Sequence, residues 1–168
     1  GHKWRFVPVP NQSATQTVLA LEKGHTYRFL VHAYDAAGNA SPAVFGPSFS
    51  VRVLEGGSPQ IAYYGRWQDG RRGAASSLGS ARGGRAVARL SFTGRGVAWV
   101  SRTGPTGGRA RVFVDGRYVR TVSLYSLTTT RRAVVFTRSW RKGRRHSVAV
   151  HPLGATPGVT VDAFVLLR

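Results

Sequence analysis

The dipeptide Asp115-Gly116 constrains the fold of this chain more than any other feature. It stands between two runs of alternating residues, 109–114 and 117–125. Asp-Gly between such runs is a strong signal of a tight β-hairpin, since both central residues of the turn need positive φ. A period of two gives each strand two different faces. In the second run it places Tyr118 and Arg120 on one face, so we expect an antiparallel sheet whose exposed side carries arginine and aromatic rings.

The rest of the C-terminal part repeats this pattern at short spacing. Strands are predicted at 61–64, 86–92, 97–101, 110–114, 118–125, 133–137, 146–151 and 159–167, with turns at 93–96, 115–116, 142–144 and 154–158. Residues 69–85 are small, polar and basic, which predicts a long mobile loop. Short strands with turn residues between them and no helical period are typical of a β-sandwich.

The N-terminal part predicts a smaller set of strands, at 3–9, 15–21, 26–34 and 49–54. The sequence Glu55-Gly56-Gly57-Ser58-Pro59 then has the composition of a linker. We therefore predict two domains, residues 1–55 and residues 56–168. No run of 18 apolar residues occurs, so no membrane-spanning segment is expected.

The charge of the chain is large and uneven. The net charge is +19, and 22 of the 25 cationic residues are arginines. Residues 1–55 contribute +2 and residues 56–168 contribute +17. Such a positive field attracts polyanions, which include nucleic acid, acidic polysaccharides and acidic membrane surfaces. The alternative is that the arginines reflect a compositional bias and serve solubility only.

The N-terminal part carries a recognisable motif. The spacing Leu21-x-x-Gly24-x-x-Tyr27-x-Phe29-x-Val31-x-Ala33-x-Asp35-x-x-Gly38-Asn39-x-Ser41 resembles the second half of a fibronectin type III domain. In that family the tyrosine forms the tyrosine corner, in which its hydroxyl bonds to backbone upstream. The resemblance lacks the first three strands of the sandwich. We interpret this as truncation by cloning or cleavage, or as strands supplied by a partner chain or by the neighbouring domain.

The second part resembles the galactose-binding-like jelly rolls found in secreted proteins of GC-rich bacteria. The resemblance rests on Tyr63-Tyr64-Gly65-Arg66-Trp67, Phe92-x-Gly94-x-Gly96-Val97-x-Trp99, Val112-x-Val114-Asp115-Gly116, Thr121-Val122-x-Leu124-Tyr125, Gly143-x-x-His146-x-Val148 and Val161-Asp162-Ala163-Phe164. Many relatives of this architecture are carbohydrate-binding modules. The fold expected is therefore all-β, a partial fibronectin type III sandwich followed by a jelly-roll β-sandwich.

The sequence gives little support for an active site or a metal site. The six carboxylates show no glycosidase-like pairing, no Gly-x-Ser-x-Gly elbow occurs, and the five histidines lack metal-ligand spacing. We therefore predict that the chain is not an enzyme. The jelly-roll resemblance implies a structural calcium ion on Asp162, but Glu55 is the only other acid nearby. Calcium takes six to eight oxygens, so we expect no cofactor and no metal, with Asp162 as the one candidate ligand.

Exposed aromatic rings and arginines are the remaining candidates for a binding site. Sugars stack on tryptophan and tyrosine, and arginine forks bind carboxylate or phosphate groups. The predicted ligand-binding residues are Tyr118, Arg120, Tyr125, Arg138, Trp140 and Arg141. For any one aromatic residue, burial in the core is the competing interpretation. Trp99, in the middle of a strand, is expected in the core, and Trp140, near a turn, is expected to be partly exposed.

Together these observations predict a non-catalytic, secreted or cell-surface module that binds polysaccharide, with an anionic polymer favoured. One alternative is a structural spacer or protein-interaction module that docks another chain on the incomplete fibronectin-type sheet. Another is nonspecific binding of polyanions such as nucleic acid. No zinc-finger, helix-turn-helix or RNA-recognition motif occurs, so sequence-specific recognition of nucleic acid is not expected.

Overall fold

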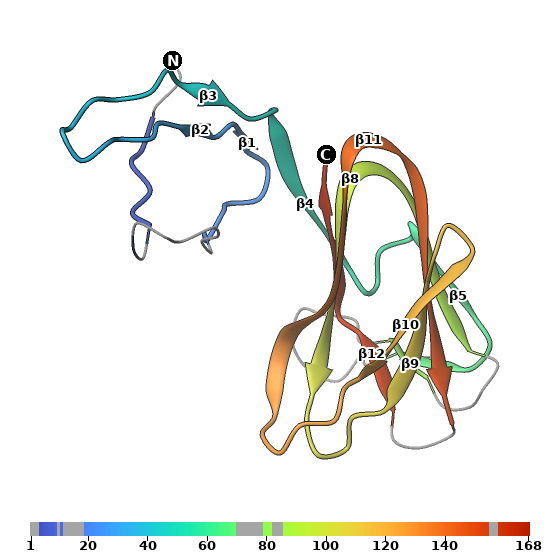
Figure 1. Cartoon of the computed structure of the whole chain (residues 1–168). Helices are drawn as coiled ribbons and strands as arrows, with labels where there is room; N and C mark the ends of the chain where they lie inside the picture. The colour runs from blue at the N-terminus through green and yellow to red at the C-terminus, as the bar shows by residue number, and fades with distance from the viewer. Residues whose placement is uncertain (1–3, 10, 12–18, 70–78, 82–85, 155–157) are drawn as a thin grey trace.

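The computed structural model describes residues 4–9, 11, 19–69, 79–81, 86–154 and 158–168, whose regular elements are all β-strands. Among these residues, no helix has the length and apolar character needed to cross a membrane. The predicted all-β class is confirmed. The described residues from Phe49 onward form a two-layered jelly-roll sandwich, and the described residues before Phe49 lie to one side of it (Figure 1).

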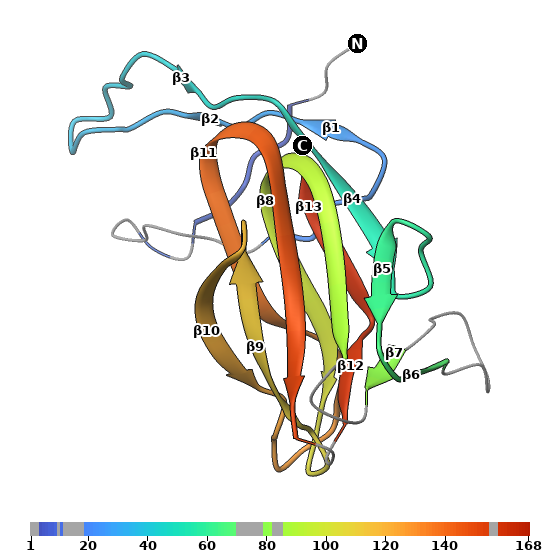
Figure 2. The ribbon, with the colours of Figure 1, turned by 90° about the vertical axis from the view of Figure 1, so that its right-hand side faces the viewer.

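Two long antiparallel strands form the frame of the sandwich. They are β8, Val87–Thr103, and β11, Thr130–Leu153. Both strands bend near the middle, so that their halves belong to different layers, and the two bends form an arch over one end of the sandwich (Figure 1, Figure 2). The register between them shifts between Ser139 and Arg144, at the bend of β11.

Glycines in the arch allow the two bends. The sequence predicts turns at 93–96 and 142–144, and both predictions are wrong, because these segments stay inside continuous strands. A Cβ on Gly94 would lie 2.5 Å from the carbonyl oxygen of Leu167, and a Cβ on Gly143 would lie 3.2 Å from Arg95 Cγ. Gly94 is therefore needed for close approach to the backbone at Leu167 rather than for chain reversal, whereas Gly143 packs against the Arg95 side chain.

One layer of the sandwich has five strands, in the order β10, β9, β11, β8, β5. Its additional strands are β5, Ile61–Tyr64; β9, Arg109–Val114; and β10, Arg117–Ser123. The predicted hairpin between β9 and β10 is confirmed. Asp115 and Gly116 have φ of 51° and 76°, as the tight turn requires.

The second layer has four strands, in the order β4, β13, β8, β11. Its additional strands are β4, Phe49–Glu55, and β13, Ala163–Leu167. A small separate sheet contains β12, Val159–Val161; β7, Gly79–Ala81; and β6, Trp67–Asp69. The loop predicted at 69–85 thus contains β7, while its residues 70–78 and 82–85 lie outside the described part of the chain.

The core lies between the two layers and is built from alternating residues of both. Trp99 and Phe164 are fully buried at its centre, as are Leu90 and Val112 from the five-stranded layer. The prediction that Trp99 is a core residue is confirmed, and its Nε1–H donates to the carbonyl oxygen of Thr160 at 3.2 Å. Burial of large apolar side chains between two sheets stabilises such a sandwich.

The N-terminal part forms three two-residue strands: β1, Thr26–Tyr27; β2, Leu30–Val31; and β3, Val44–Phe45. The strand predicted at 26–34 is therefore divided. Residues 4–9 form no strand, contrary to the prediction at 3–9, and most of the strand predicted at 15–21 lies outside the described residues. The Tyr27 hydroxyl donates to the Glu22 carbonyl at 3.0 Å and accepts the Glu22 N–H at 2.8 Å, which is the upstream backbone contact expected of a tyrosine corner.

Strand β4 joins the N-terminal part to the sandwich. It pairs with β1 through Ser50 and Phe49, and with β13 along Val51 to Glu55. The predicted division at residue 55 falls at the end of this strand and remains a prediction. The pairing with β13 means that a strand assigned by sequence to the first domain also completes the sheet of the second.

Candidate functional site

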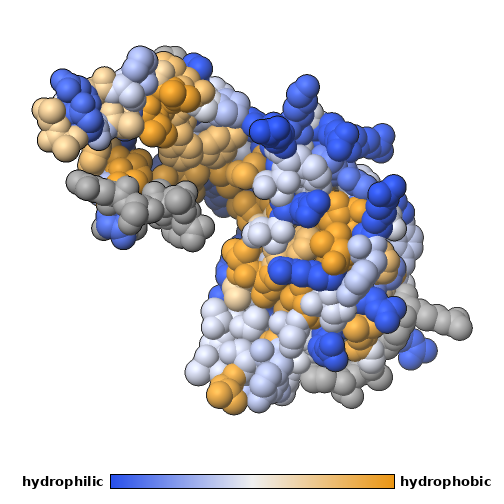
Figure 3. Space-filling view, viewed as in Figure 1, coloured by the Kyte–Doolittle hydropathy of each residue, from blue (hydrophilic) through white to orange (hydrophobic). Residues whose placement is uncertain are grey.

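Arginines without acidic partners dominate the surface of the sandwich. The carboxylate side chains that the structure describes there are Glu55, which pairs with Arg132, Asp115, which pairs with His146, and Asp162, which is buried. Glu55 pairs with Arg132, and the other arginines of the described sandwich form no ion pair with a carboxylate. Figure 3 shows hydrophilic side chains gathered over the arch and along one side of the sandwich. The positive charge is therefore available to an external anion.

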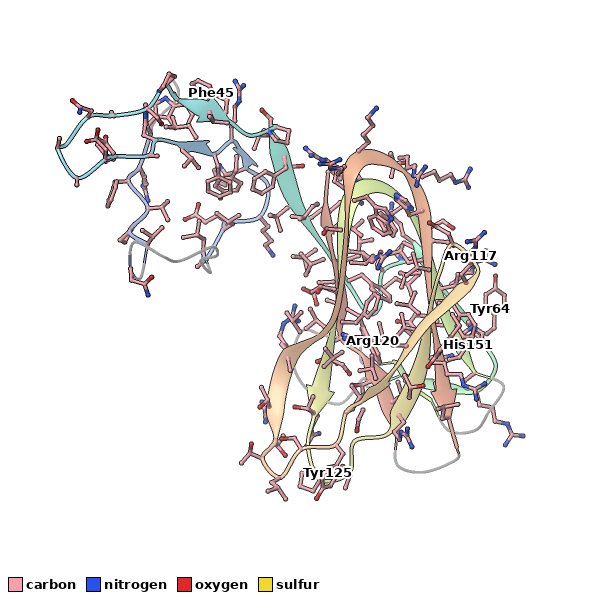
Figure 4. All side chains as sticks on the ribbon, viewed as in Figure 1. Phe45, Tyr64, Arg117, Arg120, Tyr125 and His151 are labelled. Carbon is pink, nitrogen blue, oxygen red and sulfur yellow. The ribbon has the colours of Figure 1, made fainter. Side chains whose placement is uncertain are left out.

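The outer side of the five-stranded layer combines these cations with aromatic rings. We call the part of it that contains Tyr64, Arg89, Arg111, Phe113, Tyr118 and His151 the basic-aromatic face. Arg109, which is exposed on the same side of β9, lies next to it. The strand registers bring these residues together: Tyr118 lies opposite Phe113, Arg111 opposite His151, and Tyr64 beside β8. Figure 4 places Tyr64 and His151 on the same side of the sandwich.

The rings of this face support one another. Phe113 lies edge-on to Tyr118 at 5.8 Å between centroids and lies 4.5 Å from the ring of His151. The Tyr118 hydroxyl shares a 3.1 Å hydrogen bond with the Thr121 hydroxyl. Tyr118 remains 55% exposed and Tyr64 57% exposed. Rings held in place yet open to solvent form a pre-organised stacking surface, because little side-chain entropy is lost when a ligand binds.

His151 contributes a ring rather than a fixed charge to this face. Burial lowers the pKa of His151 from its ordinary value. The imidazole therefore stays neutral to lower pH than a solvated histidine. The cations of the face are Arg111, its partner across the strands, and Arg89 on β8.

The predicted site residues Tyr118 and Arg120 do not share a face. The register of the hairpin shifts between them, so the strict alternation assumed from the sequence is interrupted by a bulge. Arg120 turns toward the edge of the sandwich, where its guanidinium lies 5.2 Å from the centre of the Phe136 ring and donates to the Val135 carbonyl at 3.2 Å. It covers the core at the gap between the two layers.

The predicted residue Tyr125 lies apart from the basic-aromatic face. It follows β10, forms an isolated bridge with Gly104, and is 58% exposed. Figure 4 shows it at the end of the sandwich opposite the arch, well away from Tyr64 and His151. Its exposure matches that of Tyr64 and Tyr118, but it lies off the rows that the strand registers bring together.

The last three predicted residues belong to the start of the arch on β11. Arg138 is exposed at the edge of the four-stranded layer, beside an open hollow of about 460 Å³. The Arg141 carbonyl accepts a 3.0 Å hydrogen bond from the Arg95 guanidinium. Trp140 is half-buried, as expected, and stacks on His146 with 3.7 Å between centroids and 15° between planes. That packing reduces the ring area of Trp140 that a ligand could reach.

His146 connects the arch to the hairpin turn. It is 2% exposed, and its Nδ1–H donates to Asp115 Oδ2 at 2.8 Å, while the Ser147 N–H donates to Oδ1 at 2.8 Å. Burial acts to raise the pKa of Asp115, but these hydrogen bonds outweigh it and the pKa is lowered. Asp115 thus serves both the turn and this contact, which positions the hairpin beneath the arch.

Asp162, the candidate calcium ligand, lies beside a guanidinium. Arg132 forms a two-pronged pair with Glu55 at 2.9 and 3.2 Å, and its charge also acts on Asp162. Asp162 is 3% exposed, and burial raises its pKa. In the described part of the chain, no three acidic or histidine side chains converge on one point. The residues of this cluster do not suit calcium, because Glu55, the other carboxylate that acts on Asp162, is already paired with Arg132, whereas calcium sites usually combine several carboxylates.

The sequence-based list of ligand-binding residues lacks five members of the basic-aromatic face: Tyr64, Arg89, Arg111, Phe113 and His151. One of them could have been found locally, since a two-residue turn at 115–116 sets Phe113 directly opposite Tyr118. The position of His151 beside Arg111 depends on the pairing of β11 with β9, which no local pattern reveals.

No protein-family profile matches the sequence, and no curated protein is similar to it in sequence. Among solved structures, a family two carbohydrate esterase from Cellvibrio japonicus matches with a TM-score of 0.51 and 12% identity over 71% of this chain and 34% of the esterase. A family 35 carbohydrate binding module from Clostridium thermocellum matches with a TM-score of 0.49 and 12% identity, over 70% of this chain and 97% of the module. The CBM35 from Cellvibrio japonicus Abf62 matches with a TM-score of 0.49 and 15% identity, over 71% and 96%.

The chain spans about a third of the length of the esterase. At 12% identity the likeness concerns the fold alone, and it agrees with the two-layered sandwich described above.

Proposed function

We propose that this chain is a non-catalytic, secreted or cell-surface module that binds an anionic polysaccharide on its basic-aromatic face. The observation that carries the proposal is the meeting of exposed rings and arginines on one sheet surface, with Phe113 braced between Tyr118 and His151. Sugar rings stack on aromatic side chains, and arginine forks bind carboxylates in a bidentate manner. Neither Arg89 nor Arg111 forms an ion pair with a carboxylate of the described chain, which supports an anionic ligand. In this proposal the module works without a metal ion.

The experiment that tests this function compares polymers at two salt concentrations. Immobilised polygalacturonate, a neutral xylan and duplex DNA are each titrated with the protein at about 50 and about 200 mM salt. Binding held by phosphate contacts alone falls by about 10³-fold or more over such a range when six or more contacts are made. We expect binding to polygalacturonate that persists at the higher salt, because stacking is not screened. Equal binding to DNA and polygalacturonate, both lost at the higher salt, would show nonspecific polyanion binding instead.

A second function is favoured by the N-terminal part. In our proposal residues 1–55 are the second half of a fibronectin type III domain, and its uncovered sheet docks another chain. Large apolar side chains are exposed there, including Phe6 at 91%, Val44 at 69% and Val31 at 65%. Light scattering tests this alternative: a discrete oligomer that dissociates on Val31→Lys and Val44→Lys substitution supports docking between copies, and a monomer at all concentrations argues against it.

A further inference from the structure

The registers of five strands arrange the basic-aromatic face as two parallel rows that cross the sheet. In the first row Tyr118 lies opposite Phe113, which lies opposite Ala149, which lies opposite Arg89. In the second row Thr121 lies opposite Arg111, which lies opposite His151. Beyond His151 the second row continues to Val87 on β8, next to Ala88, which is the last β8 residue paired with β11. The row ends at Tyr64 on β5, which lies opposite Val87.

The aromatic residues form a line through these rows. Tyr118 is on β10, Phe113 on β9, His151 on β11 and Tyr64 on β5. From β10 to β5 there are four steps between neighbouring strands, which at about 4.8 Å each give about 19 Å. A face of this length is matched to several consecutive sugar units and exceeds what one monosaccharide covers. The line crosses the strands and does not follow any one of them.

The two arginines flank this line on opposite sides. Arg111 lies in the second row on β9, beside Phe113 of the first row. Arg89 lies in the first row on β8, two residues along the same strand from Val87 of the second row. One strand, β11, separates them. A polymer laid along the rings therefore meets a cation first on one side and then on the other.

We propose that the ligand is an unbranched acidic polysaccharide bound along its length across the strands, with sugar rings on the aromatic line and successive carboxylates directed alternately to Arg111 and Arg89. This inference rests on the proposed function and specifies its ligand class and direction. Tyr118 and Tyr64, the rings at the two ends of the line, are both exposed in the described chain, and the hollow that borders Arg138 lies on the other layer. The interior of a polymer chain is therefore the part recognised, and affinity grows with chain length until the face is filled.

The test uses oligogalacturonides of two to eight units, titrated calorimetrically at constant ionic strength. For the wild type we expect affinity to rise with length and then to level off. Tyr64→Ala removes the far end of the line, so we expect about a tenfold loss for the longest oligomer, equal to about 1.4 kcal/mol, and little change for the shortest. Tyr125→Ala is the matched control, since Tyr125 is equally exposed but lies off the face.

The charged part of the inference is tested separately. We expect Arg111→Gln and Arg89→Gln each to weaken binding of the long oligomer about tenfold, while Arg102→Gln on the other layer leaves it unchanged. Methyl-esterified oligogalacturonides keep the sugar rings and remove the charge, so they should bind the wild type weakly and lose nothing further in the two arginine variants.

The outcomes separate this inference from the function on which it rests. Affinity that does not depend on length, or equal losses for short and long oligomers in Tyr64→Ala, would overturn the binding direction while polysaccharide binding itself stands. Full-strength binding of the esterified oligomers would overturn the alternating carboxylate contacts. A folded wild-type protein that binds no acidic polymer would overturn both proposals.

Discussion

The described N-terminal residues and the sandwich that follows contain similar apolar side chains, but only the sandwich buries them. In the sandwich, Trp99, Phe164 and Leu166 are fully buried between two layers. In the described part of 4–48 no residue is buried, and Phe6 and Val44 face solvent. Aromatic and branched residues are present in both regions, so composition does not explain the difference. A sheet buries its apolar side only when a second layer covers it.

The comparison also separates two kinds of exposed ring. On the sandwich, Tyr118 is braced by Phe113 and by the Thr121 hydroxyl, and Arg111 lies on the neighbouring strand. In the N-terminal part, Phe45 contacts Trp4 at 6.1 Å and the Arg28 guanidinium at 4.7 Å, above strands of only two residues. The first arrangement is a supported surface suited to a polar ligand. The second is an apolar sheet face without a covering layer in the described chain.

The largest effect is expected for the core of the sandwich. Trp99→Ala removes a fully buried ring and should lower the free energy of unfolding by about 3–5 kcal/mol. Phe45→Ala in the N-terminal part should change it by less than about 0.5 kcal/mol, because Phe45 is 48% exposed and belongs to no core. Urea denaturation of both variants measures this. Similar losses would mean that the two regions unfold as one cooperative unit.

A smaller effect should separate two glycines. Gly94→Ala forces a Cβ against the Leu167 carbonyl oxygen and should destabilise the protein by about 1–3 kcal/mol. Gly46→Ala is the control, since its Cβ would meet the Phe29 oxygen at an ordinary 3.5 Å, and it should stay within about 0.5 kcal/mol. The midpoint of thermal unfolding measures both. An equal midpoint for the two variants would show that the arch shifts to accommodate the added Cβ at little cost.

How much of the fold the sequence predicts depends on how local the cause is. The turn at Asp115-Gly116 and the burial of Trp99 follow from neighbouring residues, and both are confirmed. The turns predicted at Gly94 and Gly143 are wrong, because both glycines lie inside bent strands. At Gly94 the reason for glycine is close contact with the Leu167 backbone, which is distant in sequence. A glycine needed for close approach and a glycine needed for a turn look the same in one sequence.

The candidate site likewise combines features with local causes, which the sequence predicts, and features with long-range causes, which it does not. Tyr118 was predicted and lies on the basic-aromatic face. Arg120, two residues away, turns to Phe136 because of a bulge that the alternating pattern does not reveal. His151 joins the face through pairing between β11 and β9, which are separated in sequence. Residue type and exposure could therefore be predicted, while the grouping of residues into one surface depends on long-range register.

The smallest stability effect concerns pH. The pKa of Asp115 is lower in the folded protein than its ordinary value, so its contacts add stability above the unfolded pKa and are lost as pH falls through the folded one. The free energy of unfolding should therefore decline below about pH 4, and Asp115→Asn should flatten part of that decline. The asparagine still suits the positive φ of the turn.

Asp35→Asn provides the control for this pH dependence in the N-terminal part. The pKa of Asp35 is also lowered, chiefly by a hydrogen bond from the Asn39 side chain. Because that part has no core in the described residues, the substitution should leave cooperative unfolding of the sandwich unchanged at every pH. Chemical denaturation between pH 3 and pH 7 measures the free energy of unfolding of both variants. If Asp35→Asn changes the decline of the free energy of unfolding at low pH and Asp115→Asn does not, the decline arises in the N-terminal part, which contradicts this prediction.

The most direct test of the binding surface is an amide NMR titration of the whole chain with oligogalacturonides. If the basic-aromatic face is the site, the largest shift changes should fall on β9, β10, the end of β11 and β5, around Phe113, Tyr118, His151 and Tyr64. Residues 26–48 should stay unchanged. Changes that concentrate on residues 26–48 or on the four-stranded layer, with β9 and β10 silent, would contradict the proposed site.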